Sequence, residues 1–160
     1  MTCKVSFRHR LFGATCALLI LSGNGTAAAD KSQATCQVVP VAEWQDRSLH
    51  WDGGCKGGKA EGSGVLRAYE KKSGSPEIFY GRMHQGELSW GVMEVEGGYK
   101  AGRFVRGELQ NDGERNTIIR AFEIASSAAK AYSQRLQKTG NAVSAKFYRN
   151  KADKLDRQMD

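Results

Sequence analysis

The spacing of the glycines limits most strongly what this chain can fold into. Glycine accounts for 19 of the 160 residues and proline for only 2. From Trp51 the sequence reads W-x-G-x-C-x-x-G-x-x-x-G-x-G, and the first half of this pattern recurs from Phe79 and from Val95. Bulky residues at alternate positions share one face of a strand, and a glycine between them leaves room for a close backbone or ring. The pattern predicts an antiparallel meander of β-hairpins.

Each copy of the pattern also ends on a glycine, where a hairpin turn is expected because glycine adopts positive φ at little cost. The polar segment 71–77 reads as a longer loop, which explains why the first two copies start 28 positions apart and the next two only 16. The expected turns are Gly57-Gly58, Gln85-Gly86 and Ala101-Gly102. The repeat glycines are Gly53, Gly58, Gly62, Gly64, Gly81, Gly86, Gly97 and Gly102.

The segment from Trp51 to Gly64 resembles the MORN-repeat family, whose core reads Y-x-G-x-W-x-x-G-x-x-x-G-x-G. Trp51 stands in the tyrosine position and Cys55 in the tryptophan position, as in small exported bacterial proteins of this kind. The other two copies depart from the family pattern, with Trp90 and Arg106 at the third glycine position. The resemblance covers about residues 49–109. It implies a repeat sheet that serves as a scaffold, a lipid-proximal module or a protein-binding surface.

The first 29 residues carry the three parts of a secretory signal peptide. Lys4, Arg8 and Arg10 form a basic start, residues 11–21 are apolar, and small residues follow up to Ala29. The apolar stretch is too short to span a bilayer. A buried N-terminal helix would leave the basic start and the small residues unexplained. We therefore expect export to the periplasm or the medium, and a mature chain with a net charge of +4 instead of +7.

The mature chain would keep two cysteines, Cys36 and Cys55. In an exported protein this pair indicates one disulfide, and closing a loop of 19 positions would stabilise the fold by about 3 kcal/mol. A zinc site would need two further ligands, and neither His50 nor His84 has a metal-type spacing to the cysteines. We expect neither a metal nor another cofactor.

Beyond residue 113 the composition changes to that of a basic helical segment. Apolar residues from Ile118 to Leu136 follow a 4-3-4-3-4 spacing, which predicts an amphipathic helix that starts near Asp112 or Asn116 and ends near Lys138. A second amphipathic segment follows, with Asn141 as its expected cap. Residues 30–113 hold 11 basic and 12 acidic side chains, whereas residues 114–160 hold 10 and 5. The positive charge of the mature chain therefore lies in the helical tail.

No catalytic constellation stands out. The stretch from Gly53 to Lys59 resembles a phosphate-binding loop, but Ala60 replaces the required Ser or Thr. Glu94 and Glu96 are two apart and could act on a glycosidic bond only if they lay in a cleft. The candidate binding surface comprises the repeat aromatics Trp51, Phe79, Tyr80, Trp90 and Tyr99, which would otherwise form a core. The candidate contacts to an anionic surface are Lys146, Arg149, Lys151, Lys154 and Arg157.

These observations predict an α+β protein. Residues 1–29 would be a signal peptide, 30–112 a disulfide-stapled β-meander of MORN-like hairpins, and 113–160 one or two basic amphipathic helices. The leading hypothesis is an exported, non-enzymatic binding or scaffolding module for another envelope protein. The alternative is attachment to an anionic envelope or membrane surface through the tail. The tail is also a candidate surface for homo-oligomerisation. An enzyme acting on cell-wall glycans is a third hypothesis, and a nucleic-acid partner is not expected.

Overall fold

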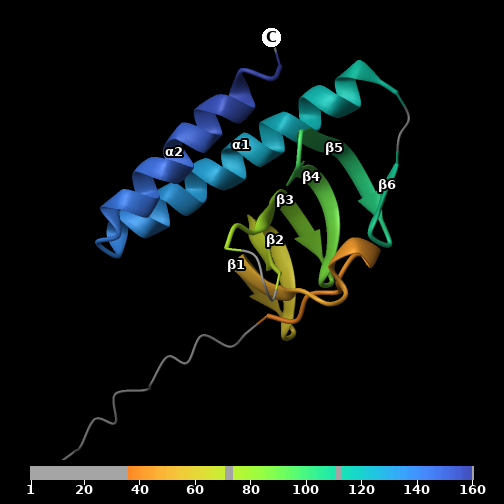
Figure 1. Ribbon diagram of the computed structural model, residues 1–160, viewed down its shortest axis with the longest axis horizontal. Coiled ribbons are helices and arrows are strands. Elements are labelled where there is room, and N and C mark those ends of the chain that lie inside the picture. The colour runs from red at the N-terminus through yellow and green to blue at the C-terminus, as the bar shows by residue number, and fades with distance from the viewer. Residues whose placement is uncertain (1–35, 71–73, 111–112, 160) are drawn as a thin grey trace, which may run out of the picture. The chain divides into compact units, whose positions relative to one another are not determined.

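A computed structural model describes residues 36–70, 74–110 and 113–159. Its main element is a six-stranded antiparallel sheet in which every strand pairs with its neighbours in sequence (Figure 1). Two helices follow the sheet, so the predicted α+β arrangement is confirmed. The predicted signal peptide, residues 1–29, lies outside the described residues. The strands are β1 (Ser48–Lys56), β2 (Lys59–Tyr69), β3 (Glu77–His84), β4 (Glu87–Val95), β5 (Gly98–Val105) and β6 (Glu108–Gln110).

The glycines within the strands line up into a row that crosses four strands. Gly64 on β2 pairs with Gly81 on β3, Gly81 with Gly91 on β4, and Gly91 with Gly102 on β5. The ring of Phe79 occupies the space beside Gly81 and Gly91, since a Cβ added at Gly81 would lie 2.5 Å from its Cζ atom. The Trp51 ring fills the corresponding space beside Gly64. The expected close approach of rings to strand glycines is therefore present.

The turns of the first two hairpins lie at the expected dipeptides, but the expected third turn is wrong. Gly102 lies inside β5, and the turn between β5 and β6 is formed by Arg106 and Gly107, both with positive φ. Gly97 belongs to the turn between β4 and β5 and not to a strand face. The third hairpin therefore starts at Gly98, and its copy of the glycine pattern starts at Lys100. The pattern that begins at Val95 straddles two hairpins.

The sheet is covered on both faces. Helix α1 (Arg115–Lys138) contacts β2, β3, β4 and β5, and helix α2 (Ala142–Asp156) packs alongside α1 (Figure 1). The tail is therefore a helical hairpin. Asn141 caps α2 as expected, because its side chain accepts a hydrogen bond from the Ser144 backbone N–H. α1 begins at Arg115, so Asn116 lies within the helix, and its other expected cap, Asp112, lies outside the described residues.

The helices and the sheet share one hydrophobic core. Val65, Tyr80 and Val92 reach it from the sheet, and Ala125 and Leu155 from the helices. We call this side of the sheet the helix face. Apolar burial of this kind stabilises the fold by about 25 cal/mol per Å².

The opposite side of the sheet is covered by residues 36–44, which we call the strap. Its last three residues form the short 3-10 helix η1 (Ala42–Trp44), and Val41 and Trp44 are buried against Leu66, Phe79 and other residues of a second core. We call this side of the sheet the strap face. The expected disulfide joins Cys36 at the start of the strap to Cys55 on β1, with 5.7 Å between their Cα atoms.

The strap crosses the ends of all three hairpins. The Gln37 N–H donates to the Gly58 carbonyl at 2.8 Å, and the Val39 N–H donates to the Gly86 carbonyl at 2.8 Å. A Cβ on Gly107 would lie 3.2 Å from Val41. Alternate strap residues therefore meet the turn glycines of successive hairpins, which fixes the position of η1 beside the last one.

Candidate functional site

The five aromatics expected to form one binding surface are divided between the two faces of the sheet. Trp51 and Phe79 belong to the core of the strap face, whereas Tyr80 and Tyr99 belong to the core of the helix face. Phe79 and Tyr80 are fully buried, so neither lines an exposed surface. This expectation is wrong because adjacent residues on a strand point to opposite faces.

Trp90, the fifth of these aromatics, is half-buried and lies under the guanidinium of Arg120 on α1, 4.8 Å from the ring centroid. The half-buried Trp51 ring donates from its Nε1 to the Gly54 carbonyl at 2.8 Å. Both contacts are of the kind that fixes an amphipathic aromatic side chain at the rim of a core. The Arg120 contact with Trp90 therefore joins α1 to the sheet, whereas the Trp51 hydrogen bond lies within β1.

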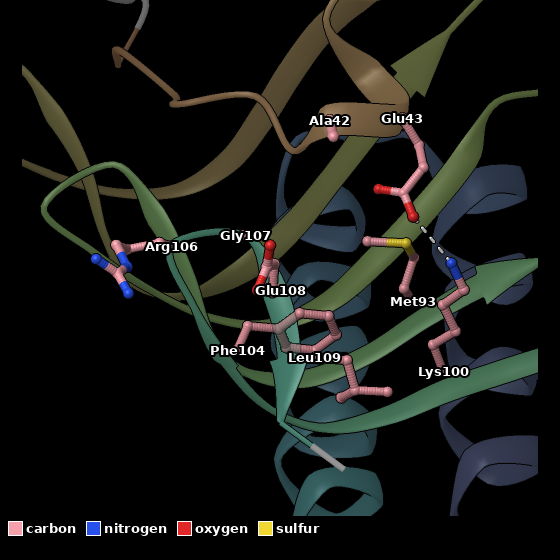
Figure 2. A pocket seen from close by; sticks show the side chains of 9 residues that line it. All are labelled: Ala42, Glu43, Met93, Lys100, Phe104, Arg106, Gly107, Glu108 and Leu109. Atoms are coloured by element: carbon pink, nitrogen blue, oxygen red, sulfur yellow. Dashed lines mark hydrogen bonds and ion pairs between the residues drawn. The ribbon is translucent and has the colours of Figure 1, made fainter.

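A groove lies where the strap ends, beside the last hairpin (Figure 2). It has a volume of about 480 Å³ and is bounded by η1, β4, β5, β6 and the turn between β5 and β6. Met93 and Phe104 are buried and Leu109 is half-buried, so these three side chains form an apolar floor. The full lining is Ala42, Glu43, Met93, Lys100, Phe104, Arg106, Gly107, Glu108 and Leu109.

Charged side chains of both signs form the rim of this groove. Figure 2 shows Glu43 reaching from η1 past Met93 toward Lys100, whose Nζ donates to its Oε1 at 3.0 Å. This hydrogen bond to Lys100 holds the pKa of Glu43 below its ordinary value. Arg106 and Glu108 are exposed on the side of the last hairpin. The groove therefore combines an apolar floor with a rim suited to polar contacts.

A second depression of about 340 Å³ borders the first. The two share Phe104 and Arg106, and the second also includes Trp90, Arg103 and His84. The end of the third hairpin thus carries two adjoining concave surfaces.

The two glutamates considered for catalysis line neither depression. Glu94 receives two hydrogen bonds from Lys151 Nζ, at 2.6 and 2.9 Å, and one from the Tyr80 hydroxyl at 3.4 Å. Glu96 is exposed in the turn between β4 and β5. Glu94 therefore joins the helices to the sheet and lines neither of these two depressions.

The basic residues expected to contact an anionic surface are not equivalent. Lys146, Arg149 and Lys154 are exposed on α2, and Arg157 is exposed just after it. The Lys151 side chain is only 13% exposed and pairs with Glu94. The inclusion of Lys151 in this set is therefore wrong. Its helical position turns it toward β4, where a partly buried carboxylate is available.

The described residues contain no group of three or more His, Cys, Asp or Glu side chains placed to hold a metal ion. Likewise, no helix among them combines the length and the apolar character needed to cross a bilayer. His84 lies 3.0 Å from Glu61, and His50 packs edge-on against Tyr69. Within the described part of the chain the histidines thus serve local contacts.

Comparisons of the chain with protein-family models, with curated proteins and with solved structures find no match. The resemblance to MORN repeats stays a prediction that rests on the spacing between Trp51 and Gly64. The pattern that starts at Val95 does not predict the groove, because the floor of the groove depends on the third hairpin, whose turn lies at Arg106-Gly107 and not at Ala101-Gly102. The spacing Lys100-x-Gly102-x-Phe104-x-x-Gly107 was the signal that could have revealed it.

Proposed function

We propose that this chain is an exported, non-enzymatic binding module that holds an extended segment of another envelope protein. The observation that carries the proposal is the groove at the third hairpin, with the floor of Met93, Phe104 and Leu109 between charges of both signs. Concave, mostly apolar sites with a few polar groups at the rim are the usual form of ligand sites.

The position of the groove favours a polypeptide as its occupant. β6 is an edge strand of the sheet and has only three residues. It pairs with Arg103, Phe104 and Val105 of β5. Sheet edges of this kind can bind an extended peptide through main-chain hydrogen bonds, while adjacent pockets receive its side chains. The exposed ion pair between Glu43 and Lys100 can exchange its partners for charges on such a segment.

Export is part of the proposal and is supported by two separate observations. The sequence of residues 1–29 has the parts of a signal peptide, and the chain contains the disulfide between Cys36 and Cys55. Disulfides persist mainly in oxidising compartments such as the periplasm or the medium.

A displayed library of random peptides tests the binding proposal. We expect selected peptides to bind the purified, oxidised protein, and to lose affinity about tenfold for the Lys100→Glu/Arg106→Glu variant. The matched control is Lys56→Glu/Lys59→Glu, which makes the same change of charge at exposed positions beside the first turn. Peptides that bind both variants equally, or no enrichment at all, would contradict the proposed groove.

A further inference from the structure

The helical hairpin carries a surface that the groove does not use. Its loop end comprises residues 138–149, from the last residue of α1 to the end of the second turn of α2. Val143 is 85% exposed and Phe147 is 51% exposed, and they lie four positions apart on one side of α2. Phe147 packs on Tyr148 and Lys151. Apart from this packing, neither side chain has a partner among the described residues that would explain why so much apolar surface is exposed.

The helical hairpin around these two side chains carries charge of a single sign. From Ile124 to Ala152 the sequence contains no acidic residue. The basic residues in this interval are Lys130, Arg135, Lys138, Lys146, Arg149 and Lys151.

Two of these cations are already engaged within the fold. Lys151 pairs with Glu94, and Arg135 donates to the Asp52 carbonyl at 2.8 Å. Lys138, Lys146 and Arg149 are exposed, and each lies within five positions of Val143 or Phe147 along the chain. The nearest acidic residue along α2 is Asp153, beyond Phe147 by nearly two turns. The loop end therefore presents an apolar pair among uncompensated positive charges.

We infer that this loop end docks onto an anionic lipid bilayer. Each basic residue close to an anionic surface strengthens such binding, and a phenylalanine inserts at the boundary between headgroups and acyl chains. A surface that binds a partner protein would instead be expected to carry charged groups of both signs, and the loop end has no acidic residue. The inference is independent of the proposed peptide groove, which lies at the third hairpin of the sheet.

Vesicle flotation tests the inference with the full chain. We expect binding to vesicles in which one third of the phosphatidylcholine is replaced by phosphatidylglycerol, and no binding to phosphatidylcholine alone. Binding should weaken as salt is added, because exposed charges are screened. Reversal of two cations in Lys146→Glu/Arg149→Glu should reduce it at least about tenfold, whereas Lys56→Glu/Lys59→Glu should change it by less than about threefold.

The apolar pair has its own readout. The Phe147→Ser variant should bind anionic vesicles several-fold more weakly while its dependence on salt stays the same. An environment-sensitive dye on a Val143→Cys variant should shift to the blue on anionic vesicles, whereas the same dye on Ser75→Cys, in an exposed loop, should not. All these positions are exposed, so circular dichroism and thermal unfolding should match the wild type.

Three outcomes would overturn the inference. The first is equal binding to neutral and anionic vesicles. The second is an equal loss of binding in the loop-end variant and in the control at Lys56 and Lys59. The third is a dimer that forms without vesicles and is abolished by Phe147→Ser, which would make the loop end an interface between two copies of the chain.

Discussion

Lys151 on α2 places its Nζ 2.6 Å from Oε1 and 2.9 Å from Oε2 of Glu94 on β4, so one ammonium group links the second helix to the middle of the sheet. The Tyr80 hydroxyl donates to the same carboxylate at 3.4 Å. The pair is only partly exposed, with 13% of the Lys151 side chain and 28% of the Glu94 side chain accessible. Such a contact is expected to matter more for stability than an exposed ion pair.

Removing this cation should destabilise the protein. We expect Lys151→Met to lower the free energy of unfolding by about 2 kcal/mol, because the partly buried Glu94 carboxylate loses its charged donor. Lys146→Met, at an exposed position five residues earlier, should change it by less than about 0.5 kcal/mol. Urea unfolding followed by circular dichroism measures both values, and equal effects would show that the link contributes nothing specific.

The glycine row should tolerate almost no side chain. A Cβ at Gly81 would lie 2.5 Å from the Phe79 ring and closer still to the Trp90 carbonyl oxygen. We expect Gly81→Ala to cost about 3 kcal/mol or more, since the packed sheet must shift to admit it. Gly98→Ala is the control, because a Cβ there meets nothing within 4 Å. Thermal unfolding of the two variants should differ clearly, and similar melting temperatures would contradict the described packing.

The disulfide should stabilise the strap against the sheet. Because Cys36 and Cys55 close a loop of 19 positions, their reduction should lower the free energy of unfolding by about 3 kcal/mol. Trp44 fluorescence should shift to the red if the strap leaves the sheet, since this side chain is fully buried. The Cys36→Ser/Cys55→Ser variant should unfold as readily as the reduced protein and should not respond to reductant. A response of that variant would point to another cause.

The protein should lose stability at alkaline pH. Burial is the main cause that raises the pKa of Tyr80, Tyr99, Tyr132 and Tyr148, and the Glu94 carboxylate adds to it at Tyr80 and Tyr99. Their folded-state pKa values exceed the unfolded value of about 10, so the unfolded chain releases protons first as the pH rises. The contribution to stability is complete below about pH 10 and falls above it.

Melting curves across the alkaline range, with the phenolate absorbance followed in parallel, test this expectation. The phenolate signal of these four tyrosines should form together with unfolding and not before it. Tyr99→Phe should reduce the steepness of the alkaline decline by up to one proton, and an unchanged slope would contradict the role assigned to Tyr99.

The sequence contained enough to predict the local parts of the fold. Several features depend on only a few neighbouring residues. These are the turns at Gly57-Gly58 and Gln85-Gly86, the end of α1 at Lys138 and the cap at Asn141. The third hairpin was misplaced because two overlapping patterns start at Val95 and at Lys100. Only the pairing of Gly102 with Gly91 across β4 and β5 distinguishes them.

The covering layers and the groove depend on contacts between distant parts of the chain. Residues 36–44 show no periodic pattern, yet Val41 and Trp44 are buried against strands that follow them by tens of residues. The groove combines Glu43 with Lys100, 57 positions away. The placement of Phe79 and Tyr80 on opposite faces of the sheet could be predicted from the sequence, because neighbouring residues on a strand face opposite ways.

The order of the elements along the chain has a consequence for how the protein is assembled. The strands precede α1 and α2, yet Val65, Tyr80 and Val92 are covered only when those helices pack against them. As the chain emerges from its N-terminal side, the strap and its disulfide partner are available early, while the helix face stays exposed to water until the last third of the residues has appeared. That interval is when an apolar sheet is most prone to aggregation, so a chaperone or rapid arrival of the helices would determine the yield of folded protein.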